Sequence, residues 1–154
     1  MQYQVTAFLY CAAILAGGCN SVRAPIDILG LKVSALAGAK PTGNIVLSSP
    51  SQFYPSYDLC INGISFDVGV DERGTVVYVA TQDSSFATPE GAKVGITLAE
   101  ALALTSDTVV TEQGWGHYVV LPSGWNVGFA EGSGLTDGAL VPGSRARWLF
   151  AKRH

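Results

Sequence analysis

The residue types best suited to acid–base chemistry are scarce in this sequence. Its 154 residues include two histidines, His117 and the C-terminal His154. Glu112 lies five positions before His117, and a carboxylate near an imidazole can form half of an acid–base site. No second catalytic group stands at a matching position, and a hydrogen-bonded histidine at a sheet edge explains His117 more simply. The sequence therefore favours a protein without enzymatic activity, with a small hydrolase using Glu112 and His117 as the alternative.

Other catalytic and cofactor motifs are absent from the sequence. There is no G-x-S-x-G or S-x-x-K nucleophile motif, no phosphate-binding loop and no dinucleotide fingerprint. The three cysteines have neither zinc-site nor C-x-x-C spacing. Asp67, Asp71 and Glu72 fit no known calcium loop and are better explained as a solvated turn. The sequence thus predicts no cofactor and no metal.

Aromatic residues in the second half of the chain are candidates for binding a partner. Exposed Trp and Tyr side chains often dominate the energetics of an interface. The strand pairing expected below places Trp115 at a strand end and Tyr118 on an outward face, whereas Trp125 falls on the core face. We therefore predict a binding surface that contains Trp115, Tyr118, Glu112 and His117.

A β-hairpin should position these residues. Residues 116–121 and 125–130 flank Pro122-Ser123-Gly124, a loop with glycine where a left-handed residue is needed. If Leu121 pairs with Trp125, then Val119 faces Val127 and His117 faces Phe129. An earlier hairpin is predicted from Ile64–Val70, which alternates apolar and polar residues, and from the β-branched residues 75–81.

One short helix is predicted between the hairpins. Thr97-Leu98-Ala99-Glu100 matches a capping box, so the helix should begin at Leu98. Apolar spacing continues along one face to Thr105, and the pattern ends near Ser106 or Asp107. A helix this short needs a flat apolar surface to pack against.

The remaining segments complete the expected fold. Residues 26–36 suggest an apolar strand interrupted by glycine, 44–47 a short strand, 48–57 a loop and 146–151 a last strand. Hairpins rather than strand–helix–strand units favour an antiparallel sheet. We predict an α+β fold, an antiparallel sheet built from hairpins with one principal short helix packed on one face, in a single domain over residues 25–154.

The N-terminus has the features of an export signal. Residues 5–16 form an apolar run of the length of a signal-peptide core, and Leu15-Ala16-Gly17-Gly18-Cys19 follows. This sequence resembles the lipobox of bacterial lipoproteins, which implies a signal peptide over 1–18, lipid on Cys19 and a tether over 19–24. The alternatives are a structural N-terminal segment, or cleavage after Ala24.

The cysteine count is compatible with export. Cys11 would leave with the leader and Cys19 would carry lipid, so Cys60 would remain alone and no disulfide is required. If Cys19 is not lipidated, a bridge between Cys19 and Cys60 is the alternative.

Residues 88–101 resemble the loop-and-helix opening of several small bacterial envelope proteins, among them barrel-assembly lipoproteins and the β-lactamase inhibitor protein. Those proteins pack helices on one side of a small antiparallel sheet. The resemblance implies this architecture and assigns no functional residue.

Charge is unevenly distributed along the chain. Residues 50–140 contain eleven acidic and two basic side chains, a formal charge of −9, whereas Arg145, Arg147, Lys152 and Arg153 lie within the last ten residues. An acidic surface repels phosphate, which argues against nucleic acid, and would attract a basic protein such as a cell-wall hydrolase of the lysozyme kind. Acidity that merely maintains solubility is the simpler alternative. We expect an exported, lipid-anchored envelope protein, periplasmic or membrane-attached, that binds another protein.

Overall fold

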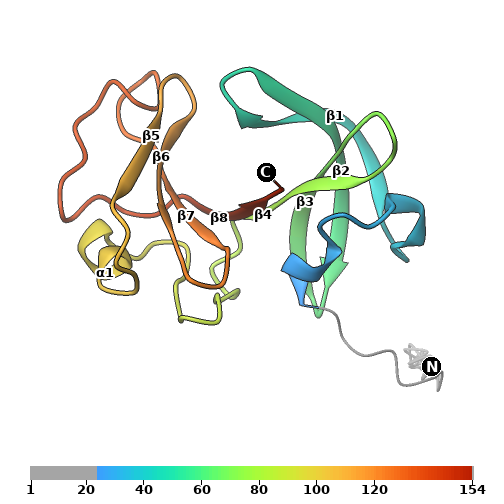
Figure 1. The fold of residues 1–154 in the computed structure, drawn as a ribbon, viewed down its shortest axis with the longest axis horizontal. Coiled ribbons are helices and arrows are strands. Elements are labelled where there is room, and N and C mark those ends of the chain that lie inside the picture. Colours follow the sequence, from blue (N-terminus) through green and yellow to red (C-terminus); the bar gives the residue numbers. More distant parts are fainter. Residues whose placement is uncertain (1–23, 154) are drawn as a thin grey trace, which may run out of the picture.

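The computed structural model describes residues 24–153, and its main element is one curved antiparallel sheet (Figure 1). The eight strands are β1 (Lys40–Ser49), β2 (Gln52–Ile61), β3 (Ile64–Val70), β4 (Val76–Thr81), β5 (Val109–Glu112), β6 (Gly116–Val120), β7 (Asn126–Phe129) and β8 (Trp148–Lys152). Their order across the sheet is β1-β2-β3-β4-β8-β7-β6-β5. Two meanders, β1–β4 and β5–β7, are therefore joined by the C-terminal strand.

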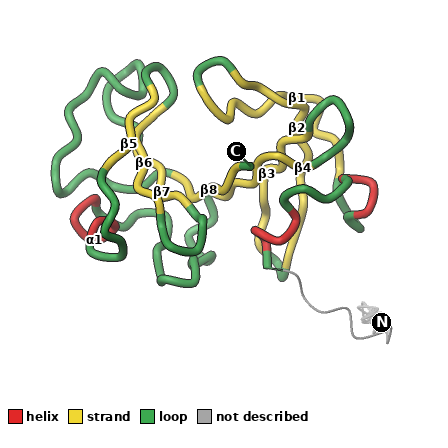
Figure 2. The backbone as a smooth tube through the Cα atoms, viewed as in Figure 1, coloured by secondary structure: helices red, strands yellow, loops and turns green. Residues whose placement is uncertain are grey.

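Both ends of the sheet bend toward the same side, so that the β1–β2 and β5–β6 hairpins rise above the central strands (Figures 1 and 2). Since side chains alternate between the two faces of each strand, the sheet has two distinct surfaces. We call them the core face, which carries Phe66, Val119 and Leu149, and the aromatic face, which carries Tyr78, Tyr118 and Phe150.

The core face is covered by short helices and loops. Two 3-10 helices, η1 (Pro25–Ile28) and η2 (Val33–Ala35), precede the sheet, and Ile28 is buried in the core. Phe86, from the loop after β4, packs edge-on against Phe66, with ring centroids 5.3 Å apart, and also contacts Trp125. These contacts keep water from the apolar side of the central strands.

Residues 26–36 were predicted as a strand, and this prediction is wrong. Gly30 has a positive φ of 83° between the two 3-10 helices. Its amide donates to the Val76 carbonyl at 2.8 Å, and the Val33 amide donates to Gly74. The segment therefore lies along the start of β4 and satisfies its polar backbone groups there without joining the sheet as a strand.

Residues 48–57 were predicted as a loop, yet most of them belong to β2. Pro55 lies opposite Ile45 in β1, and pairing of β2 with β3 begins only at Ser56. A proline is tolerated in a strand where no neighbour needs its missing amide. β1 begins at Lys40, four residues before the strand predicted over 44–47, and β5 was not predicted.

The helix α1 (Leu98–Leu102) begins where the capping box predicts. The Glu100 carboxylate accepts the Thr97 amide at 2.7 Å, and the Thr97 hydroxyl accepts the Glu100 amide at 3.2 Å. The helix ends earlier than the sequence indicates and buries only Leu98 and Ala101. The fold is thus mostly β, and a principal helix packed across one face is not confirmed.

Both predicted hairpins are present. β3 and β4 form the first, and Asn62 and Gly63, in the turn before β3, have φ angles of 54° and 81°, as a type I′ turn requires. In the second, His117 faces Phe129, as the sequence predicts. Among residues 24–153, no helix has the length and hydrophobicity needed to cross a bilayer.

Candidate functional site

Five aromatic rings gather on the aromatic face. Trp115 stands edge-on to Phe150, with centroids 5.0 Å apart and planes at 82°. The ring of Trp148 lies against the backbone of Gly128, its partner across β7 and β8. A Cβ atom at residue 128 would lie 2.3 Å from the indole. Glycine at this position is therefore what allows Trp148 to lie flat on the sheet. The remaining rings are Tyr78 and Tyr118.

Trp115 also links the two ends of the sheet. Its indole nitrogen donates to the Leu47 carbonyl of β1 at 2.8 Å, although 68 positions separate the two residues. Trp115 is 4% exposed. A buried, hydrogen-bonded indole of this kind is held in a single orientation.

Glu112 belongs to a closed polar cluster on the same face. One of its oxygens accepts hydrogen bonds from the Lys152 ammonium at 2.7 Å and from the Tyr118 hydroxyl at 2.9 Å. The ammonium also lies over the rings of Trp115 and Tyr118, at 5.3 and 5.2 Å from their centroids. Burial, followed by the hydrogen bond and charge of Glu112, raises the pKa of Tyr118 to about 12.

His117 lies on the opposite side of the sheet from Glu112. Thr111 is the residue opposite His117 in β5, and Glu112 is opposite Gly116, so their side chains alternate between faces. The Nδ1 atom of His117 lies 2.9 Å from the Thr111 hydroxyl, and its buried Nε2 has no partner among the described residues. The structure does not bring Glu112 and His117 together as an acid–base pair.

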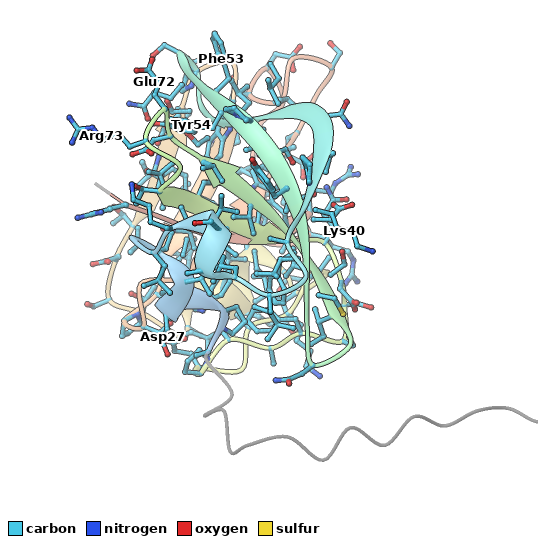
Figure 3. The ribbon with its side chains drawn as sticks, turned by 90° about the vertical axis from the view of Figure 1, so that its right-hand side faces the viewer. Asp27, Lys40, Phe53, Tyr54, Glu72 and Arg73 are labelled. Carbon is cyan, nitrogen blue, oxygen red and sulfur yellow. The ribbon has the colours of Figure 1, made fainter. Side chains whose placement is uncertain are left out.

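Of the four residues predicted to form a binding surface, Trp115, Tyr118 and Glu112 lie together on the aromatic face, and His117 lies on the core face. Trp115, Tyr118 and His117 are buried, and Glu112 is half-buried. The most exposed large apolar side chains are instead on the β1–β2 hairpin, where Ile45 is 67% and Phe53 62% exposed. Phe53 projects from the tip of this hairpin (Figure 3).

Sequence reasoning missed this hairpin because residues 48–57 were interpreted as a loop. Leu47 faces Phe53 and Ile45 faces Pro55, so all four lie on one side of the hairpin, which we call the hairpin patch. Two apolar residues at alternate positions on either side of the Pro50-Ser51 turn were the available signal.

The C-terminal basic residues lie within the sheet or beside it. Lys152 pairs with Glu112, and Arg145 donates to the Gly95 carbonyl at 2.9 Å. Hydrogen bonds from Thr97 hold the pKa of Glu100 below its usual range, and the charge of Arg145 adds to this effect. Some of the acidic excess of residues 50–140 is therefore balanced locally.

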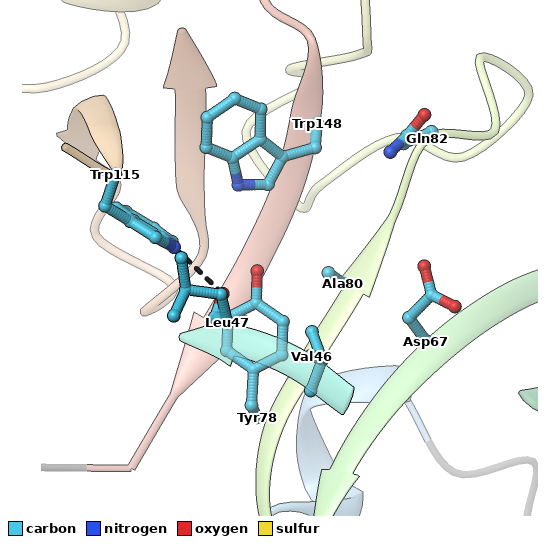
Figure 4. A pocket seen from close by; sticks show the side chains of 8 residues that line it. All are labelled: Val46, Leu47, Asp67, Tyr78, Ala80, Gln82, Trp115 and Trp148. Atoms are coloured by element: carbon cyan, nitrogen blue, oxygen red, sulfur yellow. Dashed lines mark hydrogen bonds between the residues drawn. The ribbon is translucent and has the colours of Figure 1, made fainter. Parts of the chain in front are cut away.

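A cavity of about 150 Å³ opens on the aromatic face (Figure 4). It is lined by Val46, Leu47, Asp67, Tyr78, Ala80, Gln82, Trp115 and Trp148. Asp67 and Gln82 are exposed and lie on the side away from Trp115, as Figure 4 shows. Burial, and then the charge of Asp58 on the neighbouring strand, raise the pKa of Asp67.

No group of three metal-ligating side chains is found within residues 24–153. The Asp71 carboxylate instead accepts the amides of Arg73 and Thr75 at 2.9 and 2.8 Å and so stabilises the turn between β3 and β4. Cys60 is an exposed free thiol, whereas Cys11 and Cys19 lie outside the described residues.

No protein-family model matches this chain, and comparison with curated proteins and with solved structures likewise found no match.

Proposed function

We propose that the chain is an exported, lipid-anchored envelope protein that binds another protein and has no enzymatic activity. The observation that carries the binding proposal is the hairpin patch, Ile45, Leu47, Phe53 and Pro55, beside the free edge of β1.

The hairpin patch combines two features of protein-binding surfaces. Ile45 and Phe53 expose most of their side chains, and an apolar contact of this kind gains stability when a partner excludes water from it. β1 is also an edge strand, as β5 is, so one side of its backbone is open to a further strand except at Leu47, whose carbonyl accepts the Trp115 indole. Lys40 and Pro41 protect the beginning of this edge from non-specific pairing. The exposed side chains of Ile45 and Phe53, beyond this protected part, are therefore best suited to contact a specific partner.

The arrangement of the polar residues supports a non-enzymatic function. Lys152 and Tyr118 both engage the carboxylate of Glu112, which leaves it poorly placed to act as a base. His117 faces the other side of the sheet. A hydrolase that uses these two residues is the alternative function, and it would need a rearrangement of β5 and β6.

Capture experiments test the hairpin patch. The parent protein and an Ile45→Ser/Phe53→Ser variant, each with a C-terminal affinity tag, are used to capture proteins from an envelope extract. Losing two apolar anchors should reduce specific capture at least about tenfold. Val141→Ser is the matched control, since Val141 is 54% exposed in the loop before β8. Equal capture by the parent and the double variant, or no capture above the tag alone, overturns the proposal.

Lipid attachment is tested separately. Cys19→Ala should move the protein from the membrane fraction to the soluble fraction, because a thioether-linked lipid is then absent. Cys60→Ala is the control and should fractionate like the parent. If Cys19→Ala also remains in the membrane fraction, lipidation at this residue is wrong.

An inhibitor of a basic cell-wall hydrolase is a more specific alternative. The acidic excess of residues 50–140 supports it, although Lys152 and Arg145 reduce this excess locally. Association with a basic lysozyme should weaken as salt rises and should exceed association with a basic protein that is not a hydrolase. Equal binding to both proteins would indicate charge attraction without a specific target.

A further inference from the structure

We propose that the cavity on the aromatic face binds a small quaternary ammonium ion, a trimethylammonium group attached to a short carbon chain. The geometry that points to this ligand is a set of perpendicular aromatic walls with one carboxylate at the open side. Leu47 is common to the cavity and the hairpin patch, whereas Ile45 and Phe53 do not line the cavity, so the two proposals are tested with different residues.

The walls come from three separate parts of the chain. Tyr78 belongs to β4, Trp148 to β8, and Trp115 precedes β6. The indoles of Trp115 and Trp148 are 5.7 Å apart, with planes at 84°. Tyr78 and Trp115 are 3% and 4% exposed, so half-buried Trp148 is the ring whose face a cation would contact, and the negative potential of an aromatic face attracts it.

These walls are fixed before any ligand enters. The indole nitrogen of Trp115 is held by the Leu47 carbonyl, and Trp148 is held against Gly128. In Figure 4 the hydroxyl of Tyr78 points toward the indole of Trp148. Because the side chains are already ordered, binding has little conformational entropy to lose.

The charge of the cavity favours a cation. Of the eight described residues that line it, Asp67 is the only charged one. Asp58 faces Asp67 across β2 and β3, and Lys40 faces Asp58 in turn. Lys152, which also lies on the aromatic face, is paired with Glu112. A positive ligand would relieve the repulsion between the two carboxylates, which is one cause of the raised pKa of Asp67.

A cation is already bound by the same group of rings. The ammonium of Lys152 lies over Trp115 and Tyr118. The rings hold this positive charge together with the carboxylate of Glu112, and Trp115 takes part in both the lysine contact and the cavity wall.

The aromatic end of the cavity, away from Asp67 and Gln82, favours an alkylated ammonium over one with N–H groups. The Leu47 carbonyl already accepts the Trp115 indole, and aromatic rings cannot replace the hydrogen bonds that water gives to N–H donors. A trimethylammonium group has no such donors. Its size also fits, because cavities of about 150 Å³ hold a molecule as large as benzene.

Titration of the purified full chain, followed by tryptophan fluorescence, tests the proposal. The probes are choline and its uncharged isostere, in which a tert-butyl group replaces the trimethylammonium group. Choline should give saturable binding, and the isostere should bind at least about tenfold more weakly, since it lacks the charge that the rings and Asp67 attract. Phosphocholine distinguishes the source of the trimethylammonium group. If phosphocholine binds as tightly as choline does, the natural ligand is a lipid headgroup, and if it binds more weakly, the natural ligand is a free cation.

Two variants locate the site. Asp67→Asn keeps the size of the side chain and should weaken choline binding about fivefold or more while leaving the isostere unaffected. Glu72→Gln removes the same charge from the exposed turn after β3 and should bind choline as the parent does. Circular dichroism confirms that both variants fold. Absence of saturable choline binding, equal binding of the isostere, or unchanged binding by Asp67→Asn overturns the proposal.

Discussion

The core face of the sheet buries nineteen residues, mostly aliphatic, whereas the aromatic face buries five, with Trp148 packed against them. η1, α1 and the loop that carries Phe86 cover the core face. The aromatic face is covered by its own rings and by the two raised ends of the sheet. The larger apolar area of the core face therefore supplies most of the stability, and the aromatic face depends on the fit of a few large side chains.

The largest effect is expected from removing a ring on the core face. Trp125 is 1% exposed, so Trp125→Ala should lower the free energy of unfolding by about 3–5 kcal/mol. Trp148 is only partly buried, and Trp148→Ala should cost less than half as much. Urea unfolding of both variants measures the difference. Equal losses would contradict the contrast between the two faces.

A smaller loss is expected from adding one methyl group on the aromatic face. Gly128→Ala would place a Cβ atom within the indole of Trp148 and should cost about 1–3 kcal/mol of stability. Gly143→Ala is the control, because a Cβ atom there meets nothing within 4 Å. Thermal or urea unfolding should show Gly143→Ala within about 0.5 kcal/mol of the parent. If Gly128→Ala left the free energy of unfolding unchanged, the ring of Trp148 would be free to move away from residue 128.

The polar cluster of the aromatic face contributes less to the free energy of unfolding than the packing of the aromatic rings does. Tyr118→Phe removes the hydroxyl that donates to Glu112 and should lower the free energy of unfolding by about 0.5–1.5 kcal/mol. Lys152 remains bonded to Glu112 in this variant, so the carboxylate keeps a partner. A loss above this range, measured by urea unfolding, would show that the cluster organises the rings as well.

Acid should weaken the N-terminal cap of α1. Hydrogen bonds from Thr97 lower the pKa of the Glu100 carboxyl in the folded chain, so the stability this gives is present above the unfolded pKa of about 4.3. It is lost as the pH falls through the lower, folded pKa, since the unfolded chain then binds more protons. Unfolding measured between neutral pH and pH of about 3 should show a shallower decline for Glu100→Gln than for the parent. An identical decline would contradict this assignment.

Local patterns were sufficient to predict the central strands. Alternation from Phe66 to Val70 places apolar side chains on the core face, and the loop before Trp125 sets the register of the second hairpin. The capping box at Thr97 predicts where α1 begins. Each of these signals lies within about ten residues, which is why the sequence alone reveals it.

The candidate sites depend on contacts between distant segments. The cavity brings Val46 and Asp67 beside Trp115 and Trp148, and no local pattern encodes this arrangement. Trp115 was expected at an open strand end, but the bend of the sheet brings β1 over it and buries it. Sheet curvature is a property of the whole fold, so the exposure of a strand-end aromatic could not be predicted from its neighbours.

The position of β8 has a consequence for the order of folding. β4 and β7 each pair with β8 and not with one another. As the chain emerges from its N-terminus during synthesis, both meanders are complete before residues 148–152 exist, and each then has an unpaired edge strand. The edges of β4 and β7 can be joined only when β8 enters between them. β8 thus determines when the two halves become one cooperative unit, and until it has been made both edges are open to pairing with other chains.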